Sequence, residues 1–168
     1  MTSPSAPTEY PEGTQRVAAA LAVAGLGHQP VLLPVTGRTA QDAADALGVE
    51  LGQIAKSIVF RRVSDDAAVM VVTAGDQRVD QAKVSALVGE LGRADAAFVK
   101  EATGFSIGGV SPVAHTGATI LLVDETLFRF ENIWAAAGHP HAVFELTPAD
   151  LVQLTGAPVT DVVERAQA

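Results

Sequence analysis

The chain of 168 residues contains no cysteine. Disulfides, thiolate metal sites and cysteine nucleophiles are therefore excluded, and the composition is typical of a protein made for a reducing compartment. Aromatic residues are also scarce, at 5% of the chain. We expect a cytoplasmic protein.

Basic residues are few, with 11 Lys and Arg against 19 Asp and Glu, which gives a formal net charge of -8. A protein that grips a long nucleic-acid duplex normally presents a basic face. Here the pair Arg61 and Arg62 is the only basic cluster in the sequence. The charge pattern allows contact with one or two phosphates at the end of a strand. It predicts weak, salt-sensitive binding rather than a broad nucleic-acid footprint.

Long hydrophobic runs are missing as well. The longest, "VAAALAVAGLG" at residues 17–27, is too short to cross a bilayer and has the wrong flanking charges for a signal peptide. We interpret it as a buried helix and expect no membrane association.

Residues 1–13 combine three prolines with small polar residues, which predicts a flexible tail. Residues 14–168, with enough apolar content for a core, are predicted to form a single domain.

The rest of the sequence alternates between helical and strand patterns. Helices are predicted over residues 14–26, 39–48, 80–91, 95–102 and 147–156, with Thr39 and Thr147 as N-caps and Gly48, Gly92, Gly104 and Gly156 as C-terminal stops. Strands are predicted over 30–35, 57–62, 67–75, 119–124, 128–137 and 141–146, with 57–75 as a hairpin. This order predicts a single mixed domain of the α+β class.

A glycine-rich stretch, "TGFSIGGVSP", covers residues 103–112. The pair Gly108 and Gly109 permits positive φ and lets a ligand approach the backbone, while Pro112 stiffens the exit. Such a loop can direct N–H groups at a small polar group, as in an oxyanion site. The alternative is a plain glycine turn before a strand.

Lys56 lies between an apolar helix end, "QIA", and a strand, "SIVF". A charge is poorly explained by burial at this place, and a lysine there can reach a phosphate as a point charge. The alternative is a surface lysine at a helix C-terminus.

The four histidines, Asp124 and Trp134 each allow a structural and a functional interpretation. The two histidines of "HPH" at residues 139–141 could bind a metal as a pair or form the polar wall of a pocket. Because no third ligand lies at a recognisable spacing, we favour the pocket wall and expect no metal. His28 and His115 are interpreted as solvated histidines. Asp124 is interpreted as a cap at a strand end, and Trp134 as a core residue rather than a stacking platform.

Four segments together resemble the YbaK/ProX family of aminoacyl-tRNA deacylases, free-standing relatives of the editing domain of bacterial prolyl-tRNA synthetases. They are "IAKSIVF" at 54–60, "TGFSIGGVSP" at 103–112, "ILLVDETL" at 120–127 and "AAAGHPHAVFELTPADL" at 135–151. The resemblance implies an α+β fold with a mixed β-sheet or barrel flanked by helices. It also implies hydrolysis of the ester of a mischarged tRNA, often tRNA for proline, without a metal or other cofactor. The expected partners are the 3′ end of that tRNA and prolyl-tRNA synthetase.

The resemblance also implies roles for particular residues. Lys56 would contact the terminal nucleotide of the tRNA, and Gly108 and Gly109 would form the catalytic loop. The remaining implied residues would bind substrate: Val110, Ser111, Pro112 and a histidine that is either His139 or His141. No "GxSxG" nucleophile motif is present, so the protein would position water. Two alternatives stay open, a non-catalytic module that binds tRNA ends or a synthetase, and a metal-dependent hydrolase centred on "HPH".

Overall fold

The computed structural model describes residues 10–34 and 39–165 and contains one mixed sheet flanked by helices. The strands run in the order β1-β7-β6-β2-β3-β5-β8, and β4 pairs with β2. The strands are β1 (Val31–Leu32), β2 (Ile54–Arg62), β3 (Ala68–Ala74), β4 (Leu91–Gly92), β5 (Thr119–Asp124), β6 (Ile133–His139), β7 (Ala142–Leu146) and β8 (Val159–Thr160). The helices are α2 (Glu12–Ala24), α3 (Ala40–Leu47), α4 (Gln81–Val88), α5 (Ala96–Thr103) and α6 (Pro148–Thr155). The predicted α+β class is confirmed.

The centre of the sheet is the β2–β3 hairpin, with β5 parallel to β3. Every residue of β3 is buried, because successive side chains point to opposite faces and both faces are covered. Met70 and Val72 join the larger core cluster, while Val69 and Val71 join a second cluster with Val84 of α4. The hairpin therefore separates two apolar layers.

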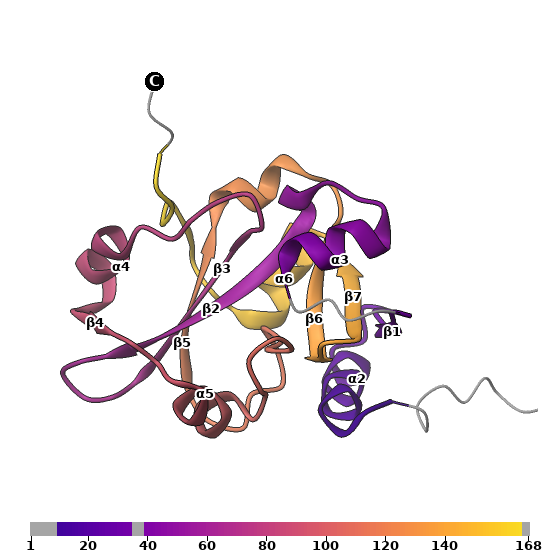
Figure 1. Cartoon of the computed structure of the whole chain (residues 1–168), viewed down its shortest axis with the longest axis horizontal. Helices are drawn as coiled ribbons and strands as arrows, with labels where there is room; N and C mark the ends of the chain where they lie inside the picture. The colour runs from indigo at the N-terminus through magenta and orange to yellow at the C-terminus, as the bar shows by residue number, and fades with distance from the viewer. Residues whose placement is uncertain (1–9, 35–38, 166–168) are drawn as a thin grey trace, which may run out of the picture.

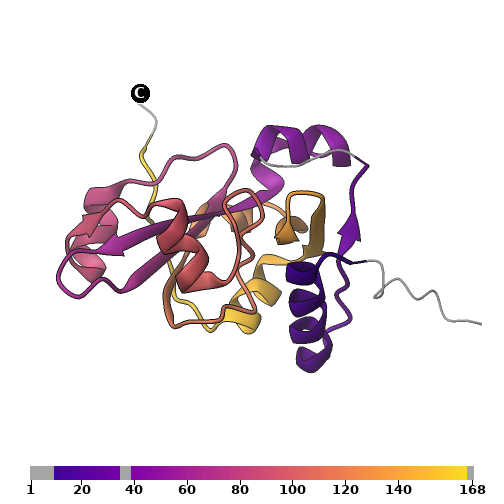
Figure 2. The ribbon, with the colours of Figure 1, turned by 60° about the horizontal axis from the view of Figure 1, so that its bottom comes forward.

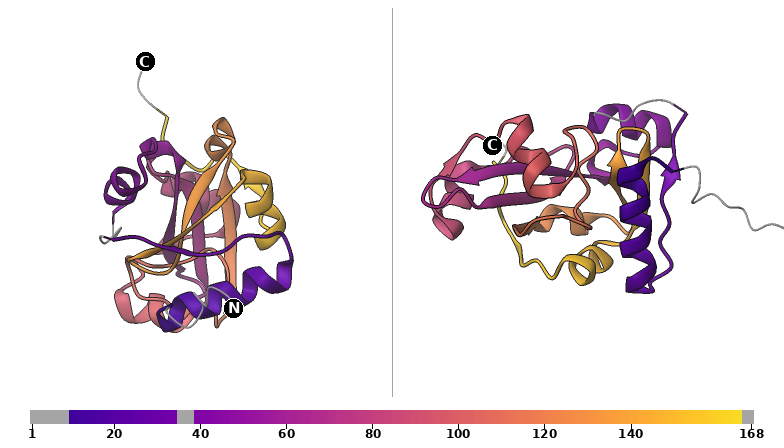
Figure 3. Two further views of the ribbon diagram at one scale, coloured as in Figure 1. Left: turned by 90° about the vertical axis from the view of Figure 1, so that its right-hand side faces the viewer. Right: turned by 90° about the horizontal axis from the view of Figure 1, so that it is seen from below.

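Further elements lie at the two ends of this hairpin. Figure 1 shows α4 and β4 at one end, and α2 with β1, β6 and β7 at the other. The view from below in Figure 3 shows α2 standing across the end of the β6–β7 pair. A Cβ atom on Gly138 would lie 2.5 Å from backbone atoms of Gly13, so the start of α2 packs directly on the end of β6.

Two predicted helices are confirmed at both ends, with the expected N-cap and the expected C-terminal glycine in each. Thr39 accepts a hydrogen bond from the N–H of Asp42, and α3 stops at Gly48 in the left-handed conformation. In the same way Thr147 accepts from the N–H of Asp150, and α6 stops at Gly156. Among the described helices, none is long and apolar enough to span a membrane.

Several boundaries differ from the sequence-based predictions. Residues 128–132 are not strand: Asp124 accepts the N–H of Thr126, which starts a 3-10 turn over Glu125–Arg129, and β6 begins at Ile133. Gly92 lies in β4, because α4 already ends at Gly89. Helix α2 begins at Glu12, inside the predicted tail, whose residues 1–9 lie outside the described part. The strand predicted over 30–35 shortens to β1, and β8 was not predicted.

Candidate active site

A cavity of about 340 Å³ opens along one edge of β2. Strand β6 pairs with β2 at Ile54 and Ala55, and β4 pairs with it at Arg61 and Arg62. Between these pairings, within the described residues, β2 has a strand partner only on its β3 side. Residues 54–59 of β2 line the cavity, which occupies this gap between β6 and β4.

The side chains that line the cavity are mostly small and apolar. They come from α3, β2, α5, β6, β7 and the loop after α5. The lining includes seven alanines, which are Ala40, Ala43, Ala55, Ala94, Ala135, Ala136 and Ala142. The titratable residues of the lining are Lys56 and His139. The cavity can therefore enclose a small apolar group beside a single lysine.

The open edge of β2 contributes backbone polar groups. At the hairpin end the N–H of Arg62 donates to the carbonyl of Ala67, so Arg62 and every second residue before it face β3. By this alternation the N–H and C=O groups of Ser57 and Val59 face the cavity side. The hydroxyl of Ser57 is buried without a hydrogen-bond partner. Polar groups of a ligand thus have donors and acceptors along an otherwise apolar wall.

The two adjacent glycines serve different purposes. Gly108 has a φ of 102° and lines the cavity with Val110. Gly109 instead lies against β6: a Cβ atom there would meet the N and Cα atoms of His139 at 2.7 Å. Its N–H donates to the carbonyl of Ser106 at 3.0 Å. Figure 2 shows this loop reaching from α5 towards β6 and β7, so Gly109 places the loop and Gly108 meets the cavity.

Ser111 and Pro112 form the end of the loop and do not line this cavity. The Ser111 hydroxyl is buried and accepts the N–H of Val113 at 3.2 Å. The Ser111 carbonyl lies 2.7 Å from Nε2 of His115. Since a carbonyl only accepts, Nε2 of His115 carries the proton and donates. These contacts make Ser111 a residue that shapes the loop from inside the protein.

The interpretation of His115 and His28 as solvated histidines was wrong. His115 is half-buried, its Nδ1 lies 2.8 Å from Oγ1 of Thr119, and burial is the main cause that lowers its pKa. His28 is 9% exposed and lies 2.9 Å from the carboxylate of Asp150. Sequence alone could not show the Asp150 partner of His28, which is 122 residues away, whereas the partners of His115 are local, at Ser111 and Thr119.

A 3-10 helix over Leu51–Gln53 ends directly before β2, and Lys56 is the third residue of that strand rather than the junction itself. It lines the cavity and is half-buried. Burial is the largest cause that lowers its pKa, the charge of Arg78 lowers it further, and Asp76 opposes the shift. Arg129 binds both carboxylate oxygens of Asp76, at 2.7 and 3.1 Å. The Asp76 charge is thus largely compensated by Arg129.

The two histidines of "HPH" flank the turn between β6 and β7, with ring centroids 5.5 Å apart. The His141 N–H donates to Nδ1 of His139 at 3.1 Å, so a neutral His139 carries its proton on Nε2. Nδ1 of His141 donates to the carbonyl of Leu33 at 3.1 Å. His139 lines both the apolar cavity and a neighbouring polar one, whereas His141 lines only the polar one of the two.

This hydrogen-bond pattern bears on the metal hypothesis. A histidine that binds a metal through Nε2 normally donates from Nδ1, yet Nδ1 of His139 accepts. Over the described ranges, no three His, Cys, Asp or Glu side chains gather around a possible metal site. The arrangement favours a pocket wall at His139 over a metal pair.

Two further side chains are placed by the structure. Asp124 is fully buried and accepts the N–H groups of Thr126 and Val162, which confirms its interpretation as a strand-end cap. Trp134 is half-buried and lines the cavity beside α3. Its indole therefore belongs to the cavity wall as well as to a core cluster.

Comparison with known proteins identifies the family. Residues 35–154 match the family described as "Aminoacyl-tRNA editing domain". The chain belongs to the aminoacyl-tRNA editing domain family. The match spans the cavity, Lys56, the glycine loop and both histidines of "HPH".

The relatives of this chain share it over very different fractions of their own length. The uncharacterized protein YwhH of Bacillus subtilis is 35% identical over 118 residues, which cover 70% of this chain and 74% of YwhH. The proline–tRNA ligase of Lactobacillus helveticus is 34% identical over 109 residues, which cover 64% of this chain and 19% of the ligase. A solved structure described as a candidate trans-editing enzyme for prolyl-tRNA synthetase has 42% identity and a TM-score of 0.86, covering 93% of this chain and 99% of that one.

Proposed function

We propose that this editing domain is a trans-editing deacylase, which hydrolyses the ester of a mischarged aminoacyl-tRNA, with tRNA for proline as the expected tRNA. The observation that carries the proposal is the small alanine-lined cavity that Lys56 and Gly108 border together. Its volume of about 340 Å³ is at the lower end for small-molecule sites. Such a cavity accepts an amino-acid side chain by size and shape, as a second editing sieve requires.

Lys56 would bind a phosphate of the terminal adenosine. Its ammonium group is a compact charge on a flexible stem. Because Arg129 already holds both carboxylate oxygens of Asp76, the acid whose charge acts on Lys56 competes little for the lysine. The phosphate contact would place the 3′ ester at the mouth of the cavity.

The glycine loop would stabilise the oxyanion. The N–H of Gly109 is used inside the loop by Ser106, whereas no hydrogen bond of the described residues takes the N–H of Gly108 or Val110. Both residues line the cavity. Backbone N–H groups held in place before the reaction lower the energy of the developing negative charge. We therefore assign the oxyanion contacts to Gly108 and Val110 rather than to Gly109.

The reaction needs few protein groups. Water adds to the ester carbonyl, the bond from that carbon to the ribose 3′-oxygen breaks, and the proton released by the water passes to the 3′-oxygen. Because Nδ1 of His139 accepts the N–H of His141, a neutral His139 carries its proton on Nε2, which makes that nitrogen a donor and not a base. We assign the orientation of the attacking water to the ribose 2′-hydroxyl beside the ester, with no metal required.

A deacylation screen over several mischarged tRNAs, with and without a chelator, tests this function. Turnover that survives chelation is expected, with a preference for small apolar amino acids on tRNA for proline. Turnover abolished by chelation would point to a metal-dependent hydrolase. Binding of tRNA ends without any turnover would instead identify a non-catalytic module.

A further inference from the structure

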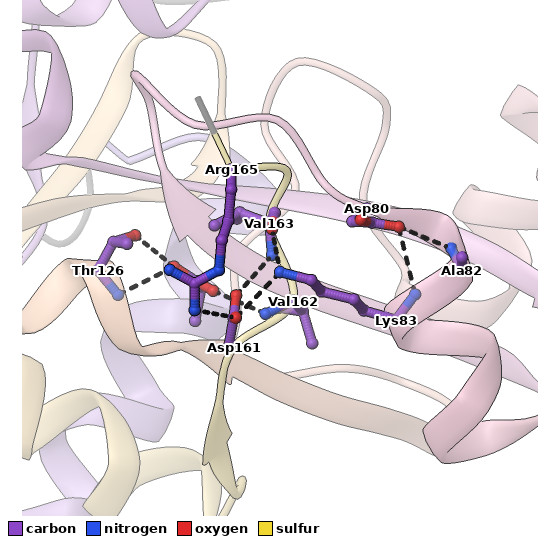
Figure 4. A network of polar contacts seen from close by, with 9 residues as sticks. Asp80, Ala82, Lys83, Thr126, Asp161, Val162, Val163 and Arg165 are labelled. Atoms are coloured by element: carbon purple, nitrogen blue, oxygen red, sulfur yellow. Dashed lines mark hydrogen bonds and ion pairs between the residues drawn. The ribbon is translucent and has the colours of Figure 1, made fainter. Parts of the chain in front are cut away.

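The basic side chains of this chain have different kinds of partner. Within the described residues, five Lys and Arg side chains form salt bridges with carboxylates: Arg61, Arg62, Lys83, Arg129 and Arg165. Figure 4 shows one such network, in which the Asp161 carboxylate contacts both Lys83 and Arg165. Arg16 of α2 instead donates hydrogen bonds to backbone carbonyls. These carbonyls belong to the glycine loop that follows α5.

Arg16 connects the start of the glycine loop to its end. Its Nη2 donates to the carbonyls of Thr103 and Ala114 at 3.2 Å each. Its Nη1 donates to the carbonyl of Gly104 and its Nε to that of Ala114, both at 3.4 Å. Thr103 and Gly104 lie where the chain leaves α5, and Ala114 comes two residues after Pro112. One guanidinium, with its planar set of five N–H donors, therefore bridges both ends of the loop.

The backbone at these ends is shaped around the guanidinium. Gly104 has a φ of 83°, and a Cβ atom there would lie 2.5 Å from Nη2 of Arg16. Ala114 has a φ of 66°, which is unfavourable for alanine because its Cβ approaches the following carbonyl oxygen. Such a conformation persists only where its surroundings hold it. Since the Ala114 carbonyl accepts two N–H groups of Arg16, these bonds hold the end of the loop.

The guanidinium is itself held in place. Its Cζ lies 4.3 Å from the centroid of the Phe105 ring, and Phe105 is buried. A cation over the face of an aromatic ring is attracted by the ring quadrupole. The carbonyls at the C-terminus of α5 also carry the negative end of the helix dipole, which favours a cation. Arg16 is therefore a fixed point for the loop rather than a mobile surface side chain.

The glycine loop lies between Arg16 and the active cavity. Arg16 lines the neighbouring polar cavity and not the apolar one. Ile107 of the loop lines both cavities, whereas Gly108 and Val110 line the apolar one of the two. Arg16 therefore contacts the loop from the side opposite to the substrate.

We propose that Arg16 is a positioning residue for the deacylation, which ties the two ends of the glycine loop together and so fixes the N–H groups of Gly108 and Val110. The inference rests on the proposed function for the oxyanion role of these N–H groups. A displacement of about 1 Å at a catalytic site costs about 100-fold in rate. Because Arg16 does not touch the substrate, its removal should lower kcat and leave KM nearly unchanged.

The variant Arg16→Gln tests this, with Lys100→Gln as the matched control. Both remove a cation that hydrogen-bonds the Gly104 carbonyl, but Lys100 reaches only the start of the loop. The kcat for deacylation should fall about 100-fold in Arg16→Gln and stay at the wild-type value in Lys100→Gln. A folded Arg16→Gln protein with the wild-type kcat would overturn the inference.

Arg16→Lys gives a second comparison if Arg16→Gln does not fold. Lysine keeps the charge but has fewer donors and a shorter reach, so it should recover only part of the rate. A reduced kcat with an unchanged KM in Arg16→Lys supports the inference, and a wild-type kcat overturns it.

Two substrate analogues separate positioning from a general loss of structure. The probes are the 3′-phosphonate analogue of aminoacyl-adenosine, which carries the tetrahedral charge of the transition state, and the 3′-amide analogue, which resembles the ester. The phosphonate should bind Arg16→Gln more weakly by about the factor lost in the rate, whereas the amide should bind as it does to the wild type. Equal losses for the two analogues would make Arg16 a merely structural residue and overturn the inference.

Hydrogen exchange tests the loop without a substrate. The N–H of Gly109 is bonded to the carbonyl of Ser106 and that of Val113 to the hydroxyl of Ser111, so their exchange reports opening of the loop. Exchange at both amides should be about 10-fold faster in Arg16→Gln than in Lys100→Gln, and equal exchange would overturn the inference. If the wild type hydrolyses no mischarged tRNA but exchange differs as expected, the proposed function fails while the tie between Arg16 and the loop stands.

Discussion

The replacement Gly109→Ala tests whether close packing on β6 sets the position of the glycine loop. The added Cβ would lie 2.7 Å from the N and Cα atoms of His139 and 2.8 Å from its carbonyl carbon. Ordinary contacts begin at 3.4 Å, so the loop and β6 must separate by about 0.7 Å. All three atoms are backbone, so no side chain can turn away to make room.

The size of the effect follows from this overlap. Forcing an extra carbon into a packed site costs about 1 to 3 kcal/mol. For a chain of 168 residues this lowers the melting temperature by about 2 to 12 °C. The loss of activity should be larger than the loss of stability suggests, because a displacement of about 1 Å at a catalytic site costs about 100-fold in rate.

The assay compares Gly109→Ala with Gly156→Ala. Gly156 ends α6 with a φ of 68°, and a Cβ there would meet nothing within 4 Å. An alanine at this left-handed position costs about 1 to 2 kcal/mol, away from the cavity. Single-turnover deacylation should fall about 100-fold in Gly109→Ala and hardly at all in Gly156→Ala. Equal rates in the two variants would refute the role of Gly109 in placing the loop.

Two other predictions concern protons and the substrate. Burial lowers the pKa of His115, so its contribution to the free energy of unfolding is complete above about pH 6.5 and is lost as the pH falls through the lower folded pKa. Urea unfolding at pH 7.5 and 5.5 should therefore show a smaller pH effect on stability in His115→Gln than in the wild type. An identical pH effect in the two proteins would contradict the burial argument. A tRNA with a 2′-deoxy terminal ribose, charged at the 3′ position, should be deacylated at least about 100-fold more slowly than the ribose form, because it lacks the hydroxyl that orients the water. Its binding should change little. A near-normal rate would require a protein side chain to act as the base.

Local interactions explain which elements could be predicted from the sequence. The caps at Thr39 and Thr147 are contacts within three residues, so the sequence contains all the information they need. Residues 128–132 have a strand-like composition, yet the Asp124 cap starts a 3-10 turn just before them. Short strands such as β8 depend on pairing with a distant strand, which a single segment cannot reveal.

In the candidate site, too, local features could be predicted from the sequence, whereas features that depend on distant segments could not. The positive φ of Gly108 is a local property and agrees with its prediction. The position of Lys56 inside β2, the close contact of Gly109 with His139, and the burial of Ser111 arise from packing between segments far apart in the chain. The choice between His139 and His141 needed the turn geometry, which places only His139 on the apolar cavity.

The most direct test of the deacylase account is single-turnover hydrolysis of the preferred mischarged tRNA by Lys56→Ala. Losing a charged hydrogen bond of about 1.5 to 3 kcal/mol should lower kcat/KM by about 10- to 100-fold. Lys100→Ala is the control, because Lys100 is exposed and binds the carbonyl of Gly104 outside this cavity. The account predicts a folded Lys56→Ala protein that has lost activity beside an active Lys100→Ala protein. A Lys56→Ala variant that deacylates at the wild-type rate would contradict it.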